Sequence, residues 1–248
     1  MLNNFLSKNK KRITGIIQVG ANLGQETKIF LENEIRHIHL FEPLHEVFLE
    51  LENKFLQQKN IYLYNYALGN TNTEMVMNVS SSNNSASSSL LDPDLHTKLF
   101  PEVEFDKKEK VIVKKLVNFN ITDSNFLFLD TQGFELEVLK GLEGDIKYID
   151  FIYSEIAREQ VFKDGVLVSQ LDQFLKNEGF VRYKTFWASN KPTGDAIYVR
   201  TKNKNLFYIL FLSAKANFTN TKIFYFFNFF KNPKKIIYLI KKNVKKYL

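Results

Sequence analysis

The sequence predicts an α/β fold built on a mostly parallel sheet of seven strands, with an antiparallel hairpin at one edge. Short apolar runs alternate with amphipathic segments over the first 65 residues, which is the pattern of a doubly wound sheet. The alternation resumes after residue 125 and ends in two successive strands with no helix between them. The 248 residues suffice for one such domain with an insertion or a tail.

The first half of the sheet is predicted from three apolar runs at 13–19, 37–41 and 61–65. A helix is expected over 25–33, and a second begins at Pro43, because the first turn of a helix tolerates proline. The apolar residues of that second helix recur at helical spacing: Leu44, Val47, Phe48, Leu51 and Phe55.

The pattern is interrupted before it returns. Residues 71–125 carry a hairpin-like piece at 74–80, a serine- and asparagine-rich run at 80–89 and an expected strand at 111–117. Strands are then expected at 126–130 and 149–155, each followed by a helix, at 134–142 and 168–177. Two closing strands are expected at 180–185 and 196–200. The closing strands form the predicted edge hairpin, and the domain is expected over 13–202.

The composition of the chain excludes several classes of site and targeting segment. There are no cysteines, which excludes disulfides, thiolate metal sites and cysteine nucleophiles. The start of the chain is polar and basic, so no secretory signal is expected. No run reaches the ~20 apolar residues that a membrane-spanning helix needs. We therefore expect a cytoplasmic protein.

The basic character belongs to the C-terminal segment, residues 203–248. This segment has ten lysines, no acidic residue and twelve Phe or Tyr, so the net charge of +7 leaves −3 for residues 1–202. No nucleic-acid partner is expected from that balance. After Pro233 the apolar residues share one helical face, which predicts a basic amphipathic helix. Such a helix suits peripheral contact with the inner face of a membrane, or packing on the domain or a partner chain.

Three strand ends are candidate cofactor contacts, because ligands of open α/β sheets bind beyond the carboxyl ends of the strands. The turn 20–24 has two glycines that allow close approach of the backbone, and the helix after it offers free N–H groups to an anion. Glu42 follows the second strand and can accept hydrogen bonds from ribose hydroxyls. Ala67 and Leu68 leave space for an adenine ring. These features fit either S-adenosylmethionine or a dinucleotide.

Several motifs occur together in one order, and with them the chain resembles the FkbM family of class I S-adenosylmethionine-dependent methyltransferases over about residues 13–200. The long segment Leu129-Asp-Thr-Gln-Gly-Phe-Glu-Leu-Glu-Val-Leu-Lys-Gly141 is the most specific of them. The others are Gln18-Val-Gly-Ala-Asn-Leu-Gly24, Phe41-Glu42-Pro43, Ala67-Leu68-Gly69-Asn70, Ser88-Ser89-Leu90 and Gly194-Asp-Ala-Ile-Tyr-Val-Arg200.

The resemblance implies a Rossmann-like class I methyltransferase fold, S-adenosyl-L-methionine as the methyl donor, and O-methylation of a hydroxyl on a carbohydrate or glycoconjugate. Two positions depart from the family, which usually has Asp where this chain has Gln18 and Glu where it has Gln132. The predicted cofactor contacts are Gln18, Gly20, Asn22, Gly24, Glu42, Ala67 and Leu68.

A sugar hydroxyl is a weak nucleophile, so a general base assists its methylation. Asp130 and Glu155 end neighbouring predicted strands, and both are expected to be catalytic at the edge near the donor. The run 80–89 is interpreted either as a lid over the acceptor site or as a flexible linker. Substrate contacts are expected at Ser88, Ser89, Gln132 and Glu135.

Two other functions remain open from the sequence: an NAD-dependent oxidoreductase, and a non-catalytic membrane-associated module that kept the fold. The glycine spacing and the edge hairpin disfavour the first, and the substitutions Gln18 and Gln132 keep the second open. No metal-ligand set is predicted, since the four histidines, His37, His39, His45 and His96, do not cluster in the sequence.

Overall fold

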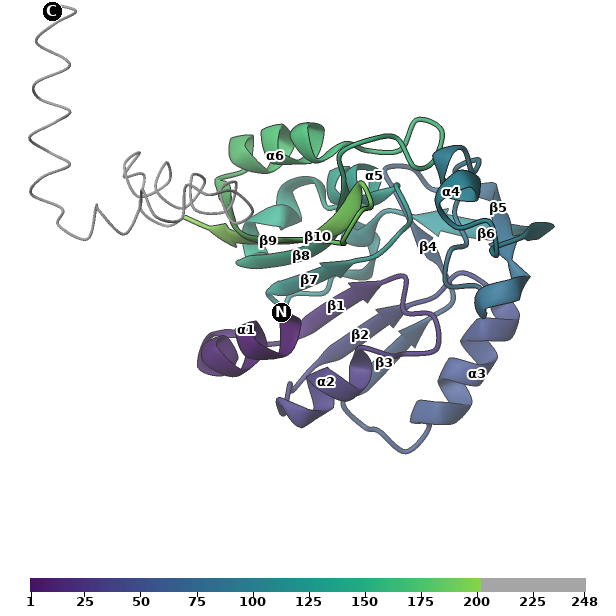
Figure 1. The fold of residues 1–248 in the computed structure, drawn as a ribbon. Helices are drawn as coiled ribbons and strands as arrows, with labels where there is room; N and C mark the ends of the chain where they lie inside the picture. Colours follow the sequence, from purple (N-terminus) through teal and green to yellow (C-terminus); the bar gives the residue numbers. More distant parts are fainter. Residues whose placement is uncertain (202–248) are drawn as a thin grey trace, which may run out of the picture.

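A computed structural model describes residues 1–201, and the basic segment 203–248 with its expected helix lies outside the described residues. Figure 1 shows a twisted sheet with helices on both faces. The helices are α1 (Leu2–Asn9), α2 (Thr27–Glu32), α3 (His45–Phe55), α4 (Leu95–Leu99), α5 (Glu135–Lys140) and α6 (Val168–Asn177). The strands of the main sheet are β1 (Ile16–Val19), β2 (Ile38–Phe41), β3 (Ile61–Tyr64), β7 (Phe126–Leu129), β8 (Phe151–Ala157), β9 (Phe180–Trp187) and β10 (Thr193–Arg200).

The main sheet has seven strands in the order β3-β2-β1-β7-β8-β10-β9. Strands β3, β2, β1, β7 and β8 are parallel, whereas β10 runs antiparallel to both β8 and β9. The predicted parallel sheet and its edge hairpin are therefore confirmed. The strand order reverses between β1 and β7, so the fold places its ligand-binding crevice at the carboxyl ends of these two strands.

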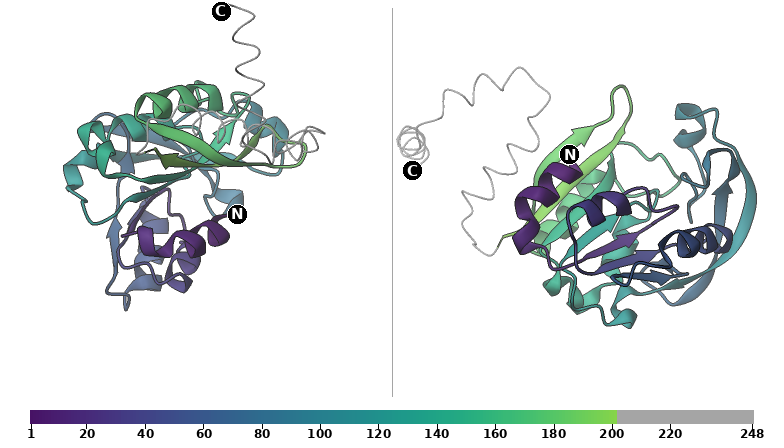
Figure 2. Two further views of the ribbon diagram at one scale, coloured as in Figure 1. Left: turned by 90° about the vertical axis from the view of Figure 1, so that its left-hand side faces the viewer. Right: turned by 90° about the horizontal axis from the view of Figure 1, so that it is seen from below.

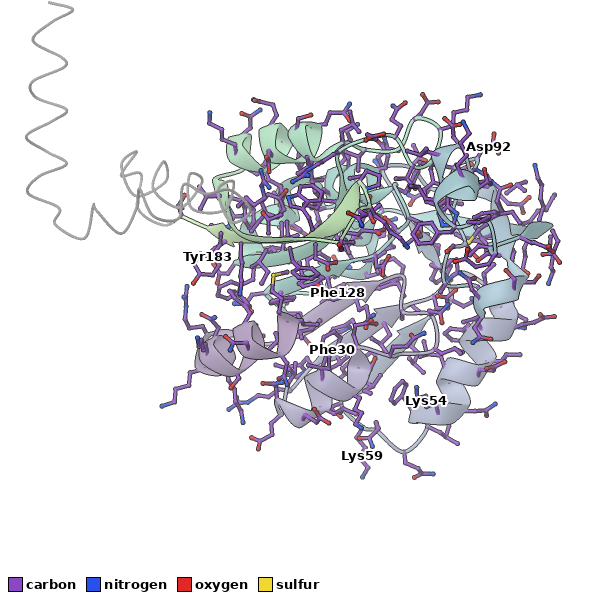
Figure 3. All side chains as sticks on the ribbon, viewed as in Figure 1. Phe30, Lys54, Lys59, Asp92, Phe128 and Tyr183 are labelled. Atoms are coloured by element: carbon purple, nitrogen blue, oxygen red, sulfur yellow. The ribbon has the colours of Figure 1, made fainter. Side chains whose placement is uncertain are left out.

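Strands β1, β2 and β7 are buried along their whole length, because helices cover both faces of the sheet. On one face α1, α2 and α3 pack on the sheet, and on the other α5 and α6 do so (Figure 1). The rings of Phe30 on α2 and Phe128 on β7 lie 6.0 Å apart between helix and sheet (Figure 3). Alternate side chains of each strand thus enter opposite cores, which explains the continuous apolar runs in the sequence.

Helix α1 was not predicted, because its few apolar residues are interspersed with polar ones and give a weak helical pattern. Leu2, Phe5 and Leu6 are buried on the sheet, and the Phe5 ring lies 5.5 Å from that of Phe151. The folded unit therefore includes residues before the expected start at residue 13.

The interruption at 71–125 forms a second sheet rather than a local hairpin. Strand β5 (Thr73–Ser80) pairs antiparallel with β6 (Phe105–Lys114), and β6 pairs parallel with β4 (Ala67–Leu68). The hairpin-like piece at 74–80 is therefore one strand whose partner lies some thirty residues later. The strand expected at 111–117 starts earlier and ends at Lys114, followed by a 3-10 turn over Leu116–Phe119.

The second sheet lies at the end of the molecule away from α1 (Figure 2). Its apolar face packs with Leu44 and Val47 from the start of α3, which carries this sheet to the crevice side of the main sheet. None of the helices within residues 1–201 is long and apolar enough to cross a bilayer.

Candidate functional site

The site lies where the turns after β1 and β7 meet. Gly20 has φ of +80°, and a Cβ built on it would lie 1.9 Å from the carbonyl oxygen of Asp130. No side chain fits in that space, so only glycine lets the first turn pass so close to the end of β7. The two strand ends that face the crevice are thereby held together.

The turn 20–24 is closed by its own hydrogen bonds. The N–H groups of Gly20 and Ala21 both donate to the carbonyl oxygen of Phe41, and that of Asn22 donates to Glu42 Oε2. The N–H groups of Leu23 and Gly24 donate to Asn22 Oδ1 and to the carbonyl oxygen of Ala21. All five distances are 2.6–3.0 Å. The following helix, α2, begins only at Thr27 and has six residues. The N–H groups of residues 20–24 are thus all used within the protein, so an N–H donor to an anion would have to come from the start of the following helix.

A cavity of about 210 Å³ opens beside this turn, at the carboxyl ends of the parallel strands. It receives five of the seven predicted cofactor contacts, which are Gly20, Asn22, Glu42, Ala67 and Leu68. Its apolar wall consists of Pro43, Leu44, Tyr66, Met77, Leu90 and Phe134. We call this space the donor cavity.

Glu42 is buried in the wall of the donor cavity, with 5% of its surface exposed. Its two carboxylate oxygens accept hydrogen bonds from the N–H groups of Leu44 (2.9 Å) and Asn22 (2.8 Å). Burial raises the pKa of Glu42 to about 7, although these two hydrogen bonds act in the opposite direction. The side chain is thus a fixed acceptor at the edge of the cavity.

Gln18 and Gly24, the other two predicted cofactor contacts, do not line the donor cavity. Gln18 is fully buried in β1, and its Nε2 donates to Glu26 Oε2 at 3.0 Å, while its Oε1 has no partner. Gly24 faces the ring of Phe55 on α3. Glu26, which the sequence analysis overlooked, lines the cavity in their place.

A second cavity of about 170 Å³ lies on the other side of Gln132. Its polar lining comes from Ser87, Gln132, Glu135, Glu155 and Thr193, and its apolar lining includes Phe100, Val161, Phe162 and Val166. His96 also lines it, with stacking on Phe100 and a buried Nδ1 that has no hydrogen-bond partner. We call this space the acceptor cavity.

Gln132 joins the two cavities and the two predicted catalytic residues. Its Nε2 donates to Asp130 Oδ1 at 2.8 Å and to Glu155 Oε2 at 3.0 Å. Asp130 lines the donor cavity and Glu155 the acceptor cavity. Burial raises the pKa of Asp130 to about 7, and burial together with the Asp130 charge raises the pKa of Glu155 well above its usual range. Two buried acids with raised pKa values, bridged by one amide, therefore lie between the cavities.

Two of the four predicted substrate contacts, Glu135 and Ser89, form hydrogen bonds to the turn that carries Gln132. Glu135 Oε1 accepts hydrogen bonds from the N–H groups of Thr131 and Gly133 at 3.0 and 3.1 Å. Ser89 Oγ donates to the carbonyl oxygen of Gln132 at 2.8 Å and is fully buried. They hold the turn on which Gln132 adopts φ of +53°. Ser88, in contrast, lines the donor cavity.

The serine-rich run covers both cavities rather than the acceptor site alone. Ser85 and Ala86 line the donor cavity, and Ser87 lines the acceptor cavity. The carbonyl oxygen of Asn84 accepts a hydrogen bond from Asn22 Nδ2 at 2.9 Å, which ties the run to the glycine turn. The run 80–89 thus contributes residues to the lining of both cavities.

No metal centre is found among residues 1–201, where no three His, Asp or Glu side chains are arranged to hold an ion. His37 and His39 share Asp123, with Nδ1 and Nε2 respectively at 3.3 and 3.0 Å from its carboxylate. They lie at the start of β2, at the edge of the sheet opposite the two cavities. We therefore assign them no part in the site.

Family comparison identifies the chemistry of this arrangement. The profile of the methyltransferase FkbM domain matches residues 18–182, more than half of the chain. The chain belongs to the FkbM methyltransferase family. This membership and the sheet order confirm the class I methyltransferase fold, and S-adenosylmethionine-dependent methyl transfer is its general activity. The match leaves no support for the oxidoreductase alternative.

This FkbM methyltransferase is also similar to several solved structures at low identity. They include an FkbM methyltransferase from Methylobacillus flagellatus KT (13% identity, TM-score 0.49), a magnesium protoporphyrin IX methyltransferase from Synechocystis PCC 6803 with bound S-adenosylhomocysteine (10%, 0.47) and an rRNA methylase from Streptococcus thermophilus (10%, 0.42). The matches cover 75%, 81% and 82% of this chain and 43%, 80% and 95% of those chains. The chain thus spans less than half the length of the first. No curated protein matches it.

Proposed function

We propose that the protein transfers a methyl group from S-adenosylmethionine to a hydroxyl of a carbohydrate or glycoconjugate. One observation carries this proposal: two carboxylates, Asp130 and Glu155, are held by one amide between a donor cavity and a second cavity. A hydroxyl in the acceptor cavity would meet a base and a methyl donor at the same junction.

The residues of the donor cavity fit S-adenosylmethionine. The Glu42 carboxylate can accept from ribose hydroxyls in its ionised form, and Leu68 and Phe134 offer apolar surface to an adenine ring. Bound there, the cofactor supplies a methyl group on a sulfonium, which is already activated for displacement. The protein must then align the acceptor and exclude water.

Asp130 is the residue best placed to take the proton of the acceptor. With its pKa near 7, an appreciable fraction is ionised at neutral pH, and a base of this strength can still accept a proton. The acceptor oxygen gains the methyl carbon as its proton moves to the carboxylate, and the carbon–sulfur electron pair stays on sulfur. Gln132 donates to both acids, so it orients them without adding a third negative charge.

The lining of the acceptor cavity supports a sugar as the acceptor. Glu155, Thr193 and Ser87 offer hydrogen bonds to hydroxyl groups, and Phe100 and Phe162 add apolar lining. A sugar ring presents both kinds of surface. The family resemblance points to the same class of acceptor.

Calorimetry and a transfer assay test the proposal together. We expect the protein to bind S-adenosylmethionine and not NAD, and to transfer label from [methyl-14C]-S-adenosylmethionine to fractionated cell glycans. Enzymatic removal of the glycan should remove the label. Binding of NAD alone, or label found only in protein, lipid or nucleic acid, would contradict the proposal. Binding of neither cofactor would favour a non-catalytic module.

A further inference from the structure

We propose that Glu26, oriented by Gln18, binds the α-ammonium group at the methionine end of S-adenosylmethionine. The inference rests on the proposed function of the donor cavity and names the residue that recognises one end of its ligand. At position 18, where the family usually has Asp, this chain has a neutral amide.

The position of Glu26 is the first support. It lies two residues after the glycine turn, immediately before α2, and its side chain lines the donor cavity. The Nε2 of Gln18 donates to its Oε2 at 3.0 Å. Gln18 cannot swing away, because it is fully buried in β1 between Leu40 on β2 and Phe128 on β7. The amide therefore fixes the carboxylate from behind.

The charges of the cavity are the second support. Three carboxylates line it, those of Glu26, Glu42 and Asp130, and no Lys or Arg among the described residues does. The negative charge of Glu26 contributes to the raised pKa of Asp130, after burial and other neighbours. Such a lining favours a cation, and S-adenosylmethionine carries two positive groups, the sulfonium and the ammonium.

Elimination among the three acids points to Glu26. Glu42 already accepts two backbone N–H groups and is the proposed partner of the ribose hydroxyls, and Asp130 accepts from Gln132 at the junction with the acceptor cavity. Glu26 receives a single hydrogen bond, from Gln18, and forms no ion pair within residues 1–201. One of its oxygens is thus left for a ligand cation.

The turn itself offers no donor to an anion at this place. All N–H groups of residues 20–24 already have acceptors inside the protein. A negative group beside Glu26 would meet a like charge with no free donor from the turn. An amide at position 18 fits an ionised Glu26, because it donates a hydrogen bond to the Glu26 carboxylate at 3.0 Å. A carboxylate at position 18 would instead repel that of Glu26.

The test compares ligands with and without the amino-acid end, by calorimetry on the full chain. For Glu26→Gln we expect S-adenosylmethionine and S-adenosylhomocysteine to bind roughly 10- to 100-fold more weakly, as for loss of a charge-assisted hydrogen bond. Binding of methylthioadenosine, which has no ammonium group, should change by less than about twofold. The control Glu32→Gln removes an exposed acid at the other end of α2 and should leave all three affinities unchanged.

The outcomes separate this inference from the proposed function. If the unaltered protein binds no S-adenosylmethionine, the proposed function fails. If it binds but Glu26→Gln weakens methylthioadenosine as much as S-adenosylmethionine, Glu26 only supports the fold of the cavity and the inference is overturned. Unchanged affinities for all three ligands overturn it as well. A second variant, Gln18→Leu, should weaken S-adenosylmethionine by a smaller factor, because Glu26 remains but loses its fixed orientation.

Discussion

The donor and acceptor cavities meet at Gln132 but are built in different ways. The donor cavity is formed at the ends of β1, β2, β4 and β7, and the carboxylate of Glu42 is fixed there by backbone N–H groups. The acceptor cavity lies between the segment 87–100 and the segment 155–166, which starts at the end of β8, and the two bridge each other at Pro93 and Phe162. Strand ends therefore form much of the donor cavity, whereas packing between these two segments forms much of the acceptor cavity.

This difference shows where each kind of specificity resides. The fold fixes the positions of the strand ends, so proteins of the same fold bind a ligand at the same place beyond them. Loops that pack on each other vary in length and sequence, and they determine which acceptor fits. The two cavities therefore respond differently to substitution, and the following predictions test that contrast in order of decreasing effect.

The largest effect is expected at the junction. Asp130→Asn removes the proposed base while keeping a partner for Gln132, so kcat should fall on the order of 100- to 10,000-fold. The Kd of S-adenosylmethionine should change far less. Activity is followed by label transfer and affinity by calorimetry, with Glu137→Gln on the surface of α5 as the control. If kcat survives in Asp130→Asn but is lost in Glu155→Gln, the base lies on the acceptor side.

A second prediction concerns the backbone of the donor side. Gly20→Ala should lower the free energy of unfolding by roughly 3 kcal/mol or more, since the new Cβ meets the Asp130 carbonyl and φ is positive. Gly144→Ala is the matched control, because nothing lies within 4 Å of its Cβ. Urea denaturation measures both. An equal effect of the two substitutions would show that the strand ends are not in the close contact described.

The sequence predicted the donor cavity better than the acceptor cavity, because strand ends can be located from local sequence patterns and contacts between distant segments cannot. Gly20, Glu42 and Ala67 follow strands that apolar runs identify, so their meeting at one edge follows from the parallel topology. Gln18 lies outside the donor cavity because alternation along β1 turns its side chain into the core below α2. Glu26 could have been found as an acid two residues after the glycine turn, the same local signal that made Glu42 a candidate.

The acceptor side had no comparable signal. His96 and Phe100 reach the cavity because 93 pairs with 162, a contact between segments some seventy residues apart. The partner of β5 is likewise non-local, so the run at 74–80 suggested a hairpin that does not exist. Helix α1 was missed because three apolar residues among lysines and asparagines give a weak periodicity. Each failure concerns a contact that local pattern does not determine.

A third prediction uses the pH dependence of stability without cofactor. The folded protein holds the Glu42 proton up to about pH 7, whereas the unfolded chain releases it near 4.5. Stability from this group is therefore present at low pH and lost as the pH rises from 4.5 to 7, by about 3 kcal/mol at most. Glu42→Gln should flatten that loss in urea titrations at pH 5, 6, 7 and 8. An unchanged slope would mean that Glu42 is ionised when the protein is free of ligand.

The smallest effect is expected in the acceptor cavity, and its sign is opposite. Burial lowers the pKa of His96, with Lys191 acting in the same direction and Glu102 against it. The folded protein therefore binds this proton less readily than the unfolded chain, and stability from a neutral His96 is lost as the pH falls below about 6.5. His96→Phe keeps a ring among Phe100, Phe105 and Phe162 and should reduce the loss between pH 7 and 5. The exposed His45 provides the control His45→Gln. Opposite slopes removed by Glu42→Gln and His96→Phe would show that these two groups depend on pH in opposite senses, whereas slopes of the same sign would refute that contrast.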